Sequence, residues 1–154
     1  MASRIAGRLA ELKIELPTPP APVASYVPAV IAGNLLYIAG QVSAATGKVI
    51  TGKVGADMSV EQAQMAARTC ALNILAQAQA ALSDLDRIRR CVKLTGFVNA
   101  AADFVDHPKV INGASDLMVD VFGDAGKHAR AAVGSSSLPL GAAVEVDAIF
   151  EISA

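Results

Sequence analysis

The 154-residue sequence has no tryptophan, few other aromatic residues and almost no net charge. Proteins that bind nucleic acids present a basic surface and stacking rings, but here the formal charge is -1 and aromatic residues make up 4%. Nucleic-acid binding is therefore not expected. The only two cysteines, Cys70 and Cys91, stand in apolar runs. We expect them to be small buried thiols and not part of a disulfide framework.

Spacings that typically hold metals or cofactors are also missing. His107 and His128 are the only histidines, and the sequence has no HxxxH, HExxH or CxxC pattern, so we expect no metal ion. Without a P-loop or a GxGxxG motif, no nucleotide cofactor is expected. The serines at 135–137 lack the GxSxG context of a nucleophile elbow. Asp103 and Asp106 cluster with His107 beside a proline and are expected to be solvated turn residues.

Long hydrophobic runs are absent as well. No stretch approaches the roughly 18 apolar residues that a membrane helix needs, and residues 1–15 lack the apolar core of a secretion signal. We expect no membrane association and a cytoplasmic location. Yet 53% of the residues are hydrophobic, which is much for one short domain to bury. Part of this surface should close against another copy of the chain.

The N-terminal residues differ from the rest of the chain. Ser3 can cap a short helix through Leu12, and the prolines that follow, between residues 17 and 22, favour an extended connector. This helix looks like an appendage. We therefore divide the chain into residues 1–22, an N-terminal helix with a proline-rich connector, and residues 23–154, the main domain.

Three short strands are expected next. Two β-branched and aliphatic runs between Val27 and Ala39 flank Ala32-Gly33-Asn34, a turn sequence typical of a hairpin. Gly40 follows at a position that suits a bulge or a close backbone approach. Residues 48–50 lie between two Thr-Gly pairs and form the third expected strand.

Two helices have clear helical periodicity. Ser59 and Gln62 form a capping box before a long helix that continues to Leu82. A second helix is expected from about Lys109 to Phe122, with Gly123 at the position of a C-terminal cap.

The remaining strands complete the predicted fold. Ile88 to Asn99 alternates, with Val92, Leu94 and Val98 on one side and Cys91, Lys93, Thr95 and Phe97 on the other. Strands at 129–133 and 143–152 follow. The order β-β-β-α-β-α-β-β predicts an α/β (α+β) fold, a mixed six-stranded sheet with two helices on one face. Lys93, Thr95, Glu145 and Asp147 would partly line the other face, which subunit packing would cover.

Arg130 is the most informative candidate for chemistry. It follows Lys127-His128-Ala129 and enters a strand of small apolar residues, where a guanidinium needs an anionic partner. Spacing alone favours an ion pair with Glu145 or Asp147 on the last strand, whereas a ligand carboxylate is the alternative. By themselves, Glu145 would be an acid on the solvent side of its strand and Tyr26 a half-buried surface phenol.

Several short motifs also occur in a particular order: Tyr26-Val27, Gly33-Asn34-Leu35-Leu36, Ala39-Gly40-Gln41, Ala129-Arg130, Leu138-Pro139 and Val144-Glu145-Val146-Asp147-Ala148-Ile149. Together they resemble the reactive-intermediate deaminase (Rid) family, also called the endoribonuclease L-PSP family, from about Tyr26 to Phe150. The N-terminal extension suggests a divergent branch. The resemblance implies a chorismate-mutase-like fold and a homotrimer with three pockets between neighbouring subunits.

The resemblance also implies an activity, the hydrolysis of reactive enamine/imine acids such as 2-aminoacrylate to 2-keto acids and ammonia. Arg130 stands where the family grips the substrate carboxylate, Glu145 where a glutamate lies near the hydrolytic water, and Tyr26 where a tyrosine lines the pocket. Gly40 is a further expected pocket residue. Three other pocket positions differ: Ala39 replaces a serine, Ser115 replaces a helix asparagine, and Ala132 replaces a small thiol.

Two other functions remain alternatives. The pocket could bind or sense a keto acid or another small carboxylate without turnover. Endoribonuclease activity, to which the family name refers, ranks third, because a neutral chain with few aromatic rings offers little to an RNA polyanion.

Overall fold

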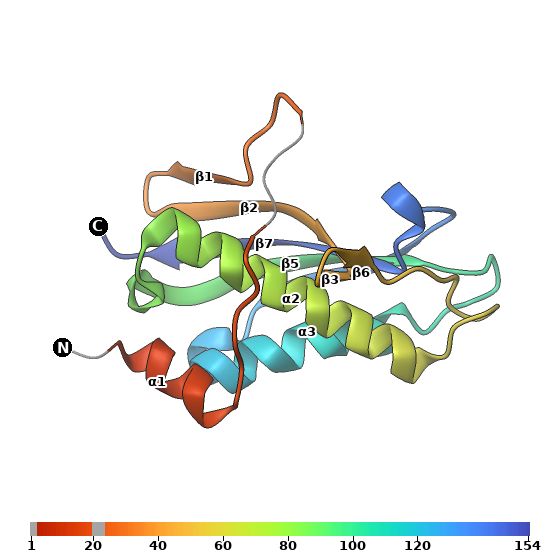
Figure 1. Ribbon diagram of the computed structural model, residues 1–154, viewed down its shortest axis with the longest axis horizontal. Helices are drawn as coiled ribbons and strands as arrows, with labels where there is room; N and C mark the ends of the chain where they lie inside the picture. The colour runs from red at the N-terminus through yellow and green to blue at the C-terminus, as the bar shows by residue number, and fades with distance from the viewer. Residues whose placement is uncertain (1–2, 20–23) are drawn as a thin grey trace.

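The structure is a computed structural model that describes residues 3–19 and 24–154. Figure 1 shows a layer of strands with the two long helices running across the same side of it. The elements in chain order are α1 (Arg4–Glu11), β1 (Ala29–Ala32), β2 (Leu35–Val42), β3 (Ala44–Ala45), β4 (Lys48–Val49), α2 (Val60–Leu82), η1 (Leu85–Arg87), β5 (Ile88–Asn99), α3 (His107–Phe122), η2 (Gly123–Gly126), β6 (Ala129–Ser135), η3 (Pro139–Gly141) and β7 (Val144–Ile152).

The main sheet is mixed and has five strands in the order β1-β2-β7-β5-β6. Only the β5–β6 pair is parallel; the other pairs are antiparallel. The expected six-stranded sheet is therefore wrong. β4 pairs instead with β3 in a separate two-stranded ribbon, because Thr46 and Gly47, both with positive φ, turn the chain back onto the residues just before them. The mixed sheet and the two helices on one face are confirmed.

The predicted hairpin is confirmed, and so is the irregularity at Gly40. β1 and β2 pair around a turn in which Gly33 has a φ of +61°. The register of β2 against β7 shifts between Ile38 and Gln41, which leaves Ala39 and Gly40 in a β-bulge. A bulge re-aims neighbouring side chains, and this one lies beside Glu145 of β7.

Both long helices follow local signals. The capping box of Ser59 and Gln62 is present at the start of α2. α3 starts at His107, two residues earlier than expected, because proline is well accepted in the first helical turn. His107 is therefore not a solvated turn residue: its ring packs edge-on against Phe104, with 5.3 Å between ring centroids, and covers the backbone of Gly134.

Side-chain alternation separates two faces of the sheet. Along β7, buried residues such as Val144, Val146 and Phe150 point to the helices, while Glu145 and Asp147 point the other way. We call this second surface the open face.

The alternation of β5 differs from the prediction at one place. Cys91 is buried with Leu94, and Val92 is not, because the register with β7 shifts between Cys91 and Lys93. Thr95 pairs with Asp147, on the open face as expected. Both cysteines are free and buried, and burial raises the pKa of Cys91 to about 12.

Helix α1 is packed into the molecule and is not an appendage. Ile5 is fully buried and belongs to the hydrophobic core. Ser3 caps the helix, as expected. The Asp86 carboxylate accepts hydrogen bonds from the Arg4 and Ile5 amides at 2.8 Å each, and these bonds lower the pKa of Asp86. The proposed domain boundary at residue 22, with part of the proline connector, falls outside the described residues. No helix in the described ranges has the length and apolar character to cross a membrane.

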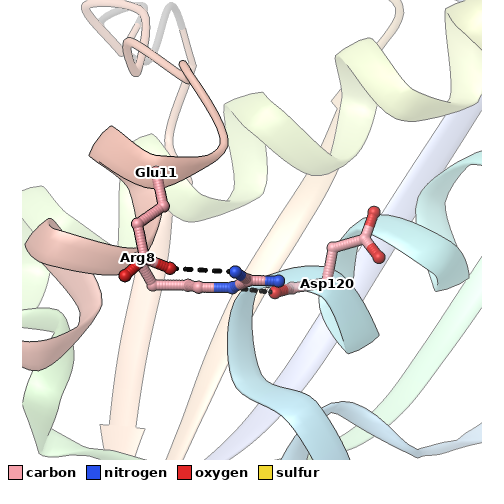
Figure 2. Close-up of polar contacts among 3 residues, drawn as sticks. All are labelled: Arg8, Glu11 and Asp120. Carbon is pink, nitrogen blue, oxygen red and sulfur yellow. Dashed lines mark hydrogen bonds and ion pairs between the residues drawn. The ribbon is translucent and has the colours of Figure 1, made fainter.

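Arg8 joins α1 to α3 (Figure 2). Its Nε donates to the backbone oxygen of Asp120 at 2.8 Å, and its Nη1 lies 3.0 Å from the Glu11 carboxylate. We expect Arg8→Ala to lower the free energy of unfolding by about 1 kcal/mol, since one charge-assisted bond to a carbonyl is lost. Glu11→Ala removes only the exposed ion pair and should cost less than about 0.5 kcal/mol. Urea denaturation of both variants checks this order, and equal losses would contradict it.

Candidate functional site

The side chain of Arg130 lies on the helix-covered side of the sheet, on the edge strand β6. It is paired in parallel register with Leu94, which is fully buried beneath the helices. Its side chain therefore reaches α3, where Nη1 donates to Oδ1 of Asn112 at 2.8 Å and to Oγ of Ser115 at 3.1 Å. Two neutral groups thus hold one nitrogen of the guanidinium.

The ion pair that spacing favoured does not form. Glu145 and Asp147 lie on the open face, across the sheet from Arg130. Within residues 3–19 and 24–154, no carboxylate is paired with this guanidinium and no group bonds to its Nε or Nη2. The Nε–Nη2 edge carries the two parallel N–H groups that grip a carboxylate, so the structure leaves the anion-binding edge of Arg130 available.

A cleft of about 260 Å³ adjoins this guanidinium. It is lined by Ser115, Val119, Lys127, His128 and Arg130. Nε2 of His128 lies 2.9 Å from Oγ of Ser115, and Nδ1 lies 2.6 Å from the backbone oxygen of Gly126. The cleft therefore combines cationic groups with a hydroxyl and an imidazole.

Glu145 lies over the bulge of β2 on the open face. Its carboxylate covers Gly40 so closely that a side chain at that position would overlap it. Burial, followed by the negative charge of Asp147, raises the pKa of Glu145. Burial also raises the pKa of Asp147, while hydrogen bonds from Thr95 oppose this shift. A carboxylate with a raised pKa is suited to acid–base chemistry.

The predicted site residues fall into two groups. On the helix side, Arg130 lies beside Ser115. Ala132 is on the same side, because it pairs with Gly96, which faces α3. Glu145 and Gly40 lie together on the open face, with Ala39 in the same bulge. Tyr26 is 54% exposed and precedes β1 by three residues. A single chain therefore does not bring the predicted residues into one pocket.

Sequence reasoning missed Asn112 and His128 as partners in this site. Asn112 precedes Ser115 by three residues on α3, a spacing that places both on one helix face, so this partner could have been found. His128 has no metal-binding spacing and no other sequence pattern that marks it as a partner of Ser115. Its contact with Ser115 spans 13 residues and depends on how α3 crosses the start of β6, for which the sequence has no local signal.

A larger cleft, of about 520 Å³, lies where the parallel strands β5 and β6 end. Its lining includes Lys53, Phe104, His107 and Ser135. The Lys53 ammonium already donates to Oδ1 of Asn99 and the oxygen of Ser136, both at 2.7 Å. Because its cation is already bonded to protein oxygens, this cleft is a weaker candidate than the one beside Arg130. Across the described residues, no three His, Cys, Asp or Glu side chains are grouped to hold a metal.

Comparisons with known proteins identify relatives over almost the whole chain. The model of the YjgF/chorismate mutase-like family, whose description also carries an endoribonuclease label, matches residues 6–152. Protein TCP17 of Trypanosoma cruzi is 48% identical over 99% of this chain and 96% of its own length. The RutC family protein y4sK of Sinorhizobium fredii is 31% identical over 87% of this chain and 92% of its own length.

Solved structures agree with this result. The Agrobacterium tumefaciens protein Atu1372, described as having unknown function, is 54% identical with a TM-score of 0.90, covering 97% of this chain and 92% of that one. Escherichia coli TdcF with bound serine shares the fold at 22% identity, with a TM-score of 0.64 over 88% of this chain and 94% of that one. The chain therefore belongs to the YjgF/RutC/Rid family and has its α+β chorismate-mutase-like fold.

Proposed function

We propose that this protein hydrolyses small reactive enamine/imine acids to 2-keto acids and ammonia. The observation that carries the proposal is the guanidinium of Arg130, held by neutral groups through Nη1 alone, with its Nε–Nη2 edge available beside a cleft. Such an edge binds a carboxylate through two parallel hydrogen bonds and orients the neighbouring imine carbon. Family membership gives this ligand class its chemical context.

The site is proposed to lie between subunits of a homotrimer. Arg130 and Glu145 are on opposite faces of one sheet, so both can reach the same ligand only if two copies contribute them. The open face also carries exposed apolar residues, among them Val30, Tyr37 and Val133. Apolar surface of this kind is typical of an interface, and contact there would remove water from around Glu145.

Glu145 would position the attacking water from the second subunit, since a carboxylate accepts a strong hydrogen bond from water. Gly40 leaves the space that this carboxylate occupies. Ala39, Ala132 and Tyr26 would line the pocket. A protonated imine is already electrophilic, so orientation, a water and a proton acceptor meet the needs of the reaction without a cofactor. The proposal includes a cytoplasmic location for the protein, as the sequence leads us to expect.

Binding without turnover is the second candidate. A carboxylate clamp serves a keto-acid sensor as well as a hydrolase, and TdcF, which shares the fold, has been solved with a bound amino acid. Endoribonuclease activity stays third, because the cleft beside Arg130 is lined by no Phe, Tyr or Trp side chain on which RNA bases could stack.

An assay that generates 2-aminoacrylate and other 2-iminoacids in situ tests the proposal. We expect the purified protein to accelerate ammonia and 2-keto acid release above the rate in buffer, for at least one small acid. Denatured protein is the control, and sedimentation analysis of the same sample should give a trimer. Pyruvate binding without acceleration for any iminoacid would select the sensor function.

A further inference from the structure

Ser115 and His128 form a hydrogen-bonded pair whose direction the surroundings determine. Nδ1 of His128 is 2.6 Å from the carbonyl oxygen of Gly126. A carbonyl only accepts hydrogen bonds, so Nδ1 carries the proton of the neutral ring, and Nε2 is an acceptor. The hydrogen between Nε2 and Oγ of Ser115, 2.9 Å apart, therefore comes from the serine.

Arg130 donates to the same serine oxygen. Its Nη1 is 3.1 Å from Oγ of Ser115. The chain of donors thus runs from Arg130 to Ser115, from Ser115 to His128, and from His128 to the Gly126 carbonyl. Each donor polarises the next in such a chain. A guanidinium beside the oxygen also stabilises negative charge on it as its proton moves toward the ring.

The backbone holds this pair in place. Gly126 packs directly on α3, where an added Cβ would lie only 2.8 Å from the amide nitrogen of Val119. The carbonyl that orients His128 is therefore fixed against the helix that carries Ser115. This arrangement belongs to one chain, unlike the proposed pairing of Arg130 with Glu145.

We propose that Ser115 and His128 are a proton relay for the imine hydrolysis at the Arg130 site. Ser115 contacts the reacting water, and His128 is a positioning residue that acts through it. The inference rests on the proposed function above and assigns proton transfer to residues on the same chain as the carboxylate clamp. Glu145 of the neighbouring copy would then orient the water without taking up its proton.

The steps balance without another reactant. Water adds to C2 of the protonated imine, a C–O bond forms, and the C=N electron pair moves to nitrogen. The water proton passes to Oγ of Ser115 as the serine proton passes to Nε2 of His128. The proton then returns through Ser115 to the nitrogen and the C–N bond breaks. The hydroxyl proton joins the departing ammonia, which leaves a ketone, an ammonium ion and a neutral ring.

Four proteins test the relay: wild type, Ser115→Ala, Ser115→Thr and His128→Gln. For each, the dissociation constant of pyruvate is measured by calorimetry, and kcat and KM are measured with 2-aminoacrylate generated in situ. We expect Ser115→Ala and His128→Gln to lower kcat by about 100-fold, the range of a positioned acid–base group. Their pyruvate affinity should stay within about threefold, because Asn112 still holds the guanidinium. Ser115→Thr keeps the hydroxyl and should retain most of the rate.

The other outcomes distinguish failure of the relay from failure of the proposed function. If the wild type hydrolyses 2-aminoacrylate and both Ser115→Ala and His128→Gln have the same kcat, the relay is wrong and the proposed function stands. The relay is also wrong if both variants lose kcat and pyruvate affinity in proportion, because the pair then serves only to hold Arg130. A wild type that binds pyruvate but does not accelerate hydrolysis overturns the proposed function and the relay with it.

Discussion

Replacement of Arg130 by methionine should lower kcat/KM for imine hydrolysis by at least about 100-fold, through the loss of a bidentate, charge-assisted contact with the substrate carboxylate. Pyruvate affinity should fall in parallel. The fold should be kept, because Arg130 makes no internal ion pair among the described residues and its two bonds go to half-buried or exposed groups on α3. Coupled ammonia assays and calorimetry measure both effects.

Arg130→Lys and Arg90→Met are the matched controls. Lysine keeps the charge without the planar fork, so its loss should be intermediate. Arg90 is exposed on β5, away from the clamp, and its replacement should change neither rate nor affinity. A rate that survives Arg130→Met would show that another group binds the carboxylate.

The same replacement makes the proposed site between subunits testable. Arg130→Met and Glu145→Gln should each be nearly inactive in a homotrimer. If the subunits are unfolded together and refolded as a random 1:1 mixture, about one quarter of the interfaces pair an intact Arg130 with an intact Glu145. Activity should therefore return to about a quarter of the wild-type level. A mixture as inactive as its components would contradict a site that Arg130 and Glu145 share across subunits.

Gly113→Ala should destabilise the fold strongly. An added Cβ would lie 2.8 Å from the Gln64 carbonyl carbon and even closer to its oxygen, where α3 crosses α2. Backbone does not yield as a flexible side chain does, so the two helices would have to separate, and the alanines packed between them would lose contacts. We expect a loss of about 3 kcal/mol, at the upper end for overpacking, which chemical denaturation followed by circular dichroism can measure.

Gly7→Ala is the matched control, since this glycine also lies within a helix. Its added Cβ would meet nothing within 4 Å. Alanine has the higher helix propensity, so this variant should be more stable by up to about 1 kcal/mol. If both alanine variants are more stable than the wild type, helix propensity, and not the α2–α3 contact, governs Gly113.

Most of the helices and strands could be predicted because their signals are local. The capping box of Ser59 and Gln62, the turn at Gly33 and the alternation of β7 each depend on residues a few positions apart. The errors come from the pairing between strands. Cys91 and Val92 exchange faces at an irregularity of register, and β4 is too short to join a large sheet. Neither a register shift nor the choice of pairing partner can be predicted from the sequence of one strand alone.

The sequence by itself determined the order of elements, the covered and open faces of the sheet, and the presence of a guanidinium at the start of β6. Tertiary structure decided which groups that guanidinium meets. Alternation placed Glu145 beyond its reach, and the crossing of α3 over β6 supplied Ser115, 15 residues earlier in the chain. The reason is physical: periodicity determines the side of an element on which a side chain lies, whereas its neighbours there depend on how separate elements pack.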